Sequence, residues 1–229
     1  AQVERFASRD ADHRLVAWMA GHSAPARVRV LDLGCAGGRN AALLAERGYD
    51  VVARDLAPAM VARTRERVAG YSGDDEAARR VRVAAMDDLN DLSDASFDLI
   101  VALGIYHQAQ DEAEWGRALD ESVRLTVPGG RLLVATFAPG TGALAAPLAR
   151  VDGTSFVYEG MRGGFLCLRT AEELDADFEA RGCVPEVPSV LVERETEDRR
   201  RVTVNAFYRR VTPRGATSAS SVPPRRSSG

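Results

Sequence analysis

The feature that most constrains the fold is a glycine-rich turn between a short apolar run and a helical segment. Residues 28–33 (VRVLDL) are apolar enough to form a buried strand, and LDLGCAGGRN spans residues 31–40. A helical pattern over 38–47 and a second apolar run over 50–53 follow, and this run ends at Arg54 and Asp55. Glycine is needed where the backbone takes a positive φ or must approach a ligand closely. This order predicts the start of an open α/β sheet with a ligand site at its edge.

The rest of the chain continues the alternation of strands and helices. We expect further helices over 10–21, 58–68, 111–125 and 170–181, and further strands over 81–86, 97–103, 130–137, 189–195 and 201–211. The polar stretch over 70–79 is expected to be a loop. The predicted fold class is therefore α/β: a Rossmann-like, doubly wound, mostly parallel seven-stranded sheet with a C-terminal antiparallel hairpin.

A chain of 229 residues suits one compact domain, which we place at 1–211. Within it, residues 138–168 are rich in Gly, Ala and Pro, and we expect a lid or a substrate-side insertion there. Residues 212–229 have low complexity and are predicted to be a disordered tail.

Composition excludes several classes of protein. The hydrophobic fraction is 45%, and the net charge of −3 gives no electrostatic reason to expect a nucleic-acid partner. All 30 basic residues are Arg, which is typical of codon bias in a GC-rich genome. The three Cys form no CxxC pair, so no disulfide framework or thiolate zinc site is expected. No apolar stretch approaches the length of a membrane span. We expect the protein to be cytoplasmic, as a monomer or a homodimer.

The glycine spacing discriminates between two cofactors. A dinucleotide fingerprint requires glycines two and five residues after Gly34, and those positions hold Ala36 and Arg39. The observed pattern of Asp32, Gly34 and Gly38 instead resembles motif I of the class I S-adenosylmethionine-dependent methyltransferases. Ala36 stands where that family commonly has Gly. This resemblance disfavours a nicotinamide oxidoreductase.

Three further segments resemble the same family. Asp55 lies 17 residues after Gly38, where a carboxylate can accept both ribose hydroxyls. MDDLNDL over 86–92 follows the third strand, and the resemblance implies that Asp87 or Asp88 meets the adenine amino group. DLNDL and GGRN are similar to the tellurite-resistance type of small methyltransferase. SFDLIVALGIYHQAQD over 96–111 is similar to the family's fourth strand and the loop that follows it.

The resemblance implies S-adenosylmethionine as cofactor and S-adenosylhomocysteine as product. The residues expected to contact the cofactor are Asp32, Gly34, Cys35, Ala36, Gly38, Asn40, Asp55, Leu56, Asp87, Asp88, Leu89, Ala102 and Leu103. Of these, Ala102 and Leu103 would line its methionine end. His107 follows the fourth strand and is the candidate general base. No metal site is expected.

The function favoured by the sequence is methyl transfer to an O, N, S or chalcogen atom of a small molecule, without a membrane partner. The alternatives are an RNA or protein methyltransferase, a non-catalytic cofactor-binding module, and the less favoured oxidoreductase. The acidic pI of about 5.7 and the lack of an appended binding domain argue against a nucleic-acid substrate. The fourth strand is followed by no Asn-Pro-Pro-Tyr-like motif of amino methylation.

Overall fold

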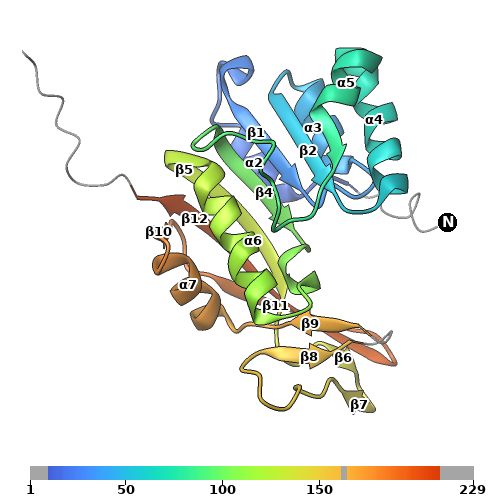
Figure 1. The fold of residues 1–229 in the computed structure, drawn as a ribbon, viewed down its shortest axis with the longest axis vertical. Coiled ribbons are helices and arrows are strands. Elements are labelled where there is room, and N and C mark those ends of the chain that lie inside the picture. The colour runs from blue at the N-terminus through green and yellow to red at the C-terminus, as the bar shows by residue number, and fades with distance from the viewer. Residues whose placement is uncertain (1–9, 161–163, 212–229) are drawn as a thin grey trace, which may run out of the picture.

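One large sheet organises the molecule. The computed structural model describes residues 10–160 and 164–211. The strands run in the order β3-β2-β1-β4-β5-β12, and β10 and β11 also pair with β12 (Figure 1). These strands are β1 (Arg29–Leu33), β2 (Asp50–Asp55), β3 (Val81–Val83), β4 (Phe97–Leu103), β5 (Thr126–Phe137), β10 (Cys183–Pro185), β11 (Val190–Glu195) and β12 (Arg199–Arg210).

The direction of the strands confirms the predicted α/β class, but the predicted number of seven strands is wrong: the described residues form a ten-stranded sheet, because additional short strands pair around β12. Strands β1 to β5 are parallel, and β12 is antiparallel to β5, to β10 and to β11. The chain builds outward from β1 to β3 and then returns to place β4 on the other side of β1. Ligands of open α/β sheets bind at such a reversal, outside the carboxyl ends of the strands. The carboxyl ends of β1, β2 and β4 are therefore where a site is expected.

Helices cover both faces of the sheet. They are α2 (His13–Met19), η1 (Pro25–Arg27), α3 (Arg39–Glu46), α4 (Pro58–Ser72), α5 (Asp74–Arg80), η2 (Tyr106–Gln108), α6 (Glu112–Leu125) and α7 (Ala171–Glu179). One buried cluster joins Leu31 to residues of α6 and α7, and the other joins Val30 to residues of α2, α3 and α4. Neighbouring residues of β1 thus point to opposite faces, as the period of a strand requires. None of the helices in the described ranges is long and apolar enough to cross a membrane.

Side-chain caps mark the start of helices α7 and α6. Thr170 and Glu173 form the capping box that their spacing indicates: the Thr170 hydroxyl accepts from the Glu173 N–H, and the Glu173 carboxylate accepts from the Thr170 N–H. At the start of α6, the Asp111 carboxylate accepts from the Glu114 N–H at 2.7 Å. Each cap satisfies amide groups that have no partner inside the helix.

Several boundaries differ from the sequence predictions. The expected polar loop over 70–79 is wrong, because α4 extends to Ser72 and α5 begins at Asp74. Gly73 has φ +83° and connects the two helices. Helix α5 is stabilised because acidic residues in its first turn and basic residues in its last turn interact favourably with the helix dipole. Glu76 also forms ion pairs with Arg79 and Arg80. The third strand ends at Val83 rather than at residue 86.

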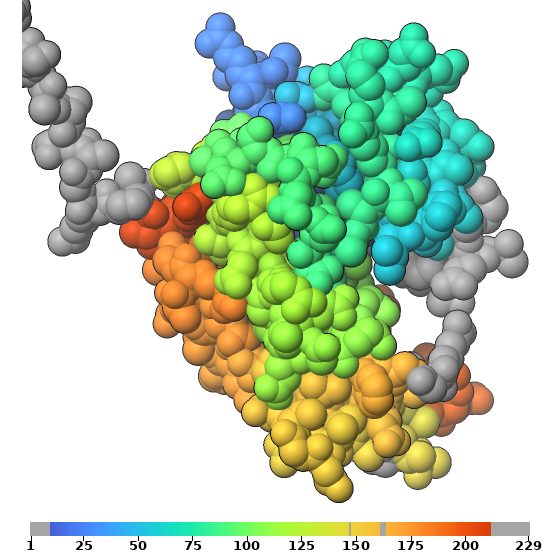
Figure 2. Space-filling view, in the orientation of Figure 1, coloured from blue at the N-terminus to red at the C-terminus, as the bar shows by residue number. Residues whose placement is uncertain are grey.

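The described residues within 138–168 contain short strands. They are β6 (Gly142–Ala143), β7 (Ala146–Pro147), β8 (Val157–Glu159) and β9 (Phe165–Cys167), and β8 pairs with β9 in a second sheet. Figure 2 shows this part of the chain, in yellow and orange, forming one end of the molecule. The Gln110 side chain holds β9 through the backbone of Phe165, accepting from its N–H at 3.2 Å and donating to its carbonyl at 3.3 Å. The predicted low-complexity, disordered tail over 212–229 lies outside the described residues.

Candidate functional site

The glycine turn after β1 has the backbone geometry that its sequence predicts. Gly34, Ala36 and Gly38 all have positive φ, at +73°, +48° and +76°. The amides of Gly34 and Cys35 donate to the carbonyl of Arg54, at 2.8 and 3.1 Å. The turn is thus held against the end of β2.

Two of these positions also need glycine for lack of space. A Cβ on Gly34 would lie 2.9 Å from the Cβ of Ile105, and one on Gly38 would lie 2.8 Å from the Thr64 hydroxyl. Ala36 keeps a Cβ in the left-handed region, which costs about 1–2 kcal/mol for a residue other than glycine. This cost gives a physical reason why Gly is common at the corresponding family position.

Asp32, before the glycine turn, and Asn40, after it, each accept a hydrogen bond that holds one end of the turn in place. The Asp32 carboxylate is buried and accepts from the Ala41 N–H at 3.0 Å. Burial raises its pKa to about 7, although the Ala41 bond and the charge of Arg39 act in the opposite direction. The Asn40 side-chain oxygen accepts from the backbone of Asp12 at 3.2 Å, which brings the segment before α2 against the turn.

Cys35 lies inside the turn with its thiol buried. Its Sγ is 3.6 Å from the hydroxyl of Thr64, and burial raises the pKa of the thiol above its ordinary value. A thiol in this state is neutral at physiological pH and is a poor nucleophile. Any contact that Cys35 makes with a ligand would therefore be made by its backbone.

Asp55 closes the site from β2. One carboxylate oxygen accepts from the Ala36 N–H at 2.9 Å, and the other accepts from the Ala57 N–H at 2.9 Å. Each oxygen of an ionised carboxylate has a second lone pair, so both can still accept from a neighbouring pair of hydroxyls. Leu56, the next residue, is 69% exposed and offers an apolar surface beside this carboxylate.

The segment after β3 presents two carboxylates with different partners. Asp87 pairs with Arg117 at 2.8 Å, and Asp88 is exposed and accepts from the side chain of Asn90 at 2.7 Å. Leu89 is fully buried, and its amide donates to the carboxylate of Glu121 at 3.0 Å. Both Asp87 and Asp88 stay candidates for an adenine contact.

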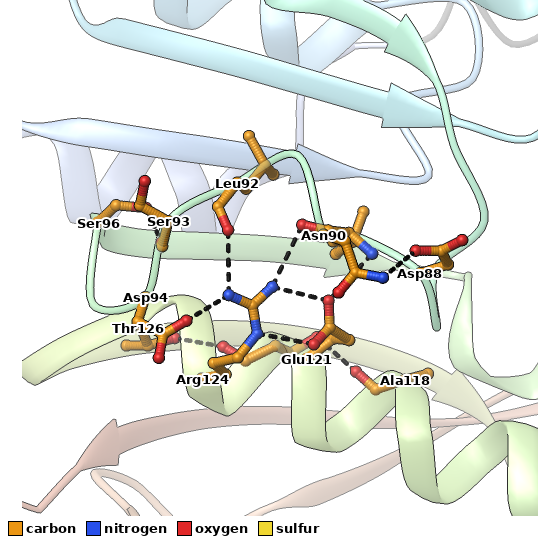
Figure 3. A network of polar contacts seen from close by, with 12 residues as sticks. Asp88, Asn90, Leu92, Ser93, Asp94, Ser96, Ala118, Glu121, Arg124 and Thr126 are labelled. Carbon is orange, nitrogen blue, oxygen red and sulfur yellow. Dashed lines mark hydrogen bonds and ion pairs between the residues drawn. The ribbon is translucent and has the colours of Figure 1, made fainter.

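A polar network fixes this segment to α6 (Figure 3). The Arg124 guanidinium donates to the carbonyls of Leu92, at 3.0 Å, and Leu89, at 3.2 Å, and it pairs with Glu121 at 2.7 Å. Charge-assisted hydrogen bonds of this kind are stronger than neutral ones. The backbone over 87–92 is thus held in one position relative to the helix.

His107 is buried between the ends of β4 and β5. Its ring stacks on Phe137 with a centroid distance of 3.9 Å, and its Nδ1 accepts from the Phe137 N–H at 3.4 Å. Burial lowers the pKa of the imidazole to about 3, so the ring is neutral at pH 7 and weakly basic. In this structure its contacts are those of a packing residue, and its role as a base stays a prediction.

The other two predicted residues of β4 differ in exposure. The side chain of Ala102 is fully buried in the cluster that contains Leu33 and Val134, so only its backbone can face a ligand. Leu103 is half-buried and packs on the opposite cluster. One region is thus surrounded by the carboxyl ends of β1, β2 and β4 and by the segment after β3.

A comparison with known proteins finds a family model that resembles this region. Residues 31–134 match the model described as a methyltransferase domain. They are 104 of the 229 residues, so this part of the chain is similar to a methyltransferase domain. The matched residues run from within β1 into β5 and include every predicted cofactor contact.

Curated relatives of this chain carry O-methyltransferase names. It is 36% identical over 131 residues to a ubiquinone biosynthesis O-methyltransferase of Xylella fastidiosa, a match that covers 56% of this chain and 48% of the relative. It is 34% identical over 154 residues to a malonyl-[acyl-carrier protein] O-methyltransferase of Pectobacterium atrosepticum, covering 66% and 55%. The chain therefore spans about half the length of the curated relatives it matches.

Solved structures share the methyltransferase fold. A Burkholderia thailandensis 1,6-didemethyltoxoflavin-N1-methyltransferase aligns with a TM-score of 0.60 at 23% identity, covering 93% of this chain and 79% of that one. The [4+2]-cyclase SpnF aligns with a TM-score of 0.61 at 18% identity, covering 90% and 85%. Since proteins with such different names share this architecture, the fold alone does not define the reaction.

One buried residue of the site is absent from the sequence predictions. Arg54 is only 2% exposed, directly before Asp55. The signal that could reveal it is a charged residue directly after the apolar run Val51–Ala53 of β2.

Two surface clefts, of about 300 and 380 Å³, share Asp50, Glu76 and Arg80, and neither is lined by a predicted cofactor residue. Among the described residues, no group of three or more His, Cys, Asp or Glu could hold a metal ion.

Proposed function

We propose that this domain transfers the methyl group of S-adenosylmethionine to a small-molecule nucleophile. The observation that carries the proposal is the 2.9 Å hydrogen bond between the Ala36 amide and the Asp55 carboxylate. It joins the glycine turn to the acidic end of β2, which are the two parts that the family resemblance assigns to the cofactor. The match over residues 31–134 supports the same assignment.

The residues at this edge have the donor and acceptor groups that the cofactor requires. Asp55 would accept from the ribose hydroxyls, Asp87 or Asp88 from the adenine amino group, and Leu56 would pack against the base. Asp32 and the turn would face the methionine end, where an ionised Asp32 complements a cationic group. When bound, the cofactor supplies a sulfonium methyl group that is already electrophilic.

The protein's own contribution is alignment and exclusion of water. A nucleophile must approach the methyl carbon in line with the leaving sulfur, which requires both molecules to be held in fixed positions. An acceptor that arrives ionised, such as a carboxylate or a thiolate, needs no protein base. A hydroxyl acceptor needs one, and His107 is the candidate for that role.

We favour an oxygen acceptor, because both curated relatives named above are O-methyltransferases. Nitrogen, sulfur and chalcogen acceptors are the alternatives. Residues 138–168 are the proposed acceptor side, since they lie outside the matched domain and dock on the segment that follows His107.

Two measurements test the proposal. Titration calorimetry with S-adenosylhomocysteine should give saturable one-site binding to the full chain. A screen of carboxylates, phenols, thiols, amines and chalcogen oxyanions with methyl-labelled cofactor should then release S-adenosylhomocysteine for one acceptor class. Failure to bind the nucleoside would refute the assignment of the cofactor. Binding without turnover across the screen would indicate a non-catalytic module or a macromolecular acceptor.

A further inference from the structure

A buried arginine lies between the two segments assigned to the nucleoside. Arg54 is the penultimate residue of β2, directly before Asp55, and its side chain is 3% exposed. A charged side chain is rarely this buried unless it is paired and hydrogen-bonded. Its partners therefore indicate what the residue does.

The backbone of Arg54 contacts the glycine turn. Its carbonyl oxygen accepts from the amides of Gly34, at 2.8 Å, and Cys35, at 3.1 Å. The turn leaves β1 at this point, so the position of Arg54 fixes where the turn begins. The next residue, Asp55, holds the same turn through the Ala36 amide.

The guanidinium of Arg54 reaches the segment after β3. Nη1 donates to the carbonyls of Ala53 and Arg80, both at 2.9 Å, and Nη2 donates to the carboxylate of Asp91 at 2.7 Å. Asp91 is three residues after Asp88, and its side chain is 40% exposed. An ion pair with one buried partner is weakly screened by solvent, so it holds its two chain segments more firmly than an exposed pair does.

The segment that contains Asp91 therefore has two anchors. On one side Arg124 and Glu121 attach it to α6, as Figure 3 shows. On the other side Arg54 attaches it to β2. Arg54 differs from the α6 anchors because it also contacts the glycine turn and adjoins Asp55.

We propose that the Arg54–Asp91 ion pair fixes the spacing between Asp55 and the carboxylates of Asp87 and Asp88. Arg54 is thereby a positioning residue for recognition of the adenine amino group. This inference rests on the proposed function, because it assumes that ribose and adenine bind at these two places.

The test compares two nucleosides that differ at the adenine amino group. S-adenosylhomocysteine carries this group, and S-inosylhomocysteine has a carbonyl oxygen there. Calorimetry on the wild type should show a preference of about tenfold or more for the first, since a lost hydrogen bond of about 1.4 kcal/mol corresponds to tenfold. In Asp91→Ala the preference should fall below about threefold, and Asp91→Asn, which can still accept from Arg54, should recover part of it.

Arg82→Met is the matched control. Its guanidinium also faces Asp91, but at 3.9 Å and with a 51% exposed side chain. Removing this charge should leave the nucleoside preference unchanged. Melting temperatures without ligand compare the stability of all variants, and Asp91→Asn carries the test if Asp91→Ala is unfolded.

The ratio of the two affinities separates positioning from a purely structural role. A variant that binds both nucleosides more weakly by the same factor would overturn the inference, as would a wild type that binds both equally well. A wild type that binds neither would instead refute the proposed function, so the two failures are distinguishable.

Discussion

The buried carboxyl of Asp32 should make the stability of the protein depend on pH. Asp32 is 2% exposed, and burial raises its pKa from an ordinary value near 3.8 to about 7. In the unfolded chain the carboxyl loses its proton near pH 4, whereas in the folded protein it loses it only near pH 7. Unfolding between these values releases a proton, so the free energy of unfolding falls as pH rises from 4 to 7.

The size of the effect follows from the pH interval. Each pH unit in this window contributes about 1.4 kcal/mol, so raising the pH from 5 to 8 should cost about 2 to 3 kcal/mol through Asp32 alone. Asp32→Asn removes the titrating group and can still accept from the Ala41 amide. The free energy of unfolding of the variant minus that of the wild type should therefore be about 2 to 3 kcal/mol larger at pH 8 than at pH 5.

Urea unfolding of both proteins at pH 5 and pH 8 measures the difference directly, and comparing the two proteins cancels every contribution that they share. A stability difference that is the same at both pH values would show that Asp32 is ionised throughout, and would refute the reasoning.

We also expect the variant to bind S-adenosylhomocysteine more weakly at pH 8, because it lacks the charge assigned to the methionine end.

Four other substitutions test the site. Asp55→Ala should weaken binding of S-adenosylmethionine at least tenfold, or about 1.4 kcal/mol, and unchanged affinity in calorimetry would contradict the ribose assignment. Gly34→Ala should lower the free energy of unfolding by about 2 to 4 kcal/mol, through backbone strain and contact with Ile105. Ala36→Gly should change the free energy of unfolding by less than about 1 kcal/mol, because relief of backbone strain and gain of entropy in the unfolded chain oppose each other. If chemical denaturation shows equal losses of stability for Gly34→Ala and Ala36→Gly, the difference predicted between them is wrong. With an ionised acceptor, His107→Ala should lower turnover without changing the shape of the pH–rate profile near neutrality, whereas a flattened profile would assign it the role of base.

The parts of the fold that could be predicted are those that the local sequence determines. The glycine turn, β4 over Phe97–Leu103 and the capping box at Thr170 follow from backbone preference, apolar runs and a fixed hydrogen-bond spacing. Helix α5 was not predicted, because the polar composition of residues 70–79 suggested a loop, whereas the Glu76 ion pairs depend on a helix being present.

The site was predictable where one residue carries its own motif context, and not where a role depends on distant partners. Asp55 follows from its position after Gly38, and the structure places it against the turn. The ion pair of Arg54 with Asp91 joins residues 37 positions apart, and no local pattern indicates it. The burial of His107 likewise depends on Phe137, thirty residues later in the chain.

The docking of residues 138–168 has a consequence for how acceptor choice could change in evolution. Gln110 binds Phe165, the Asp111 carbonyl accepts from the Cys167 thiol at 3.4 Å, and the Glu112 carboxylate accepts from the Ser155 amide. Three consecutive residues thus connect the segment that matches the family model to the proposed acceptor side. A descendant could exchange the proposed acceptor side for another segment and retain the matched domain intact, provided that the new segment offers backbone groups and a donor to the same short stretch.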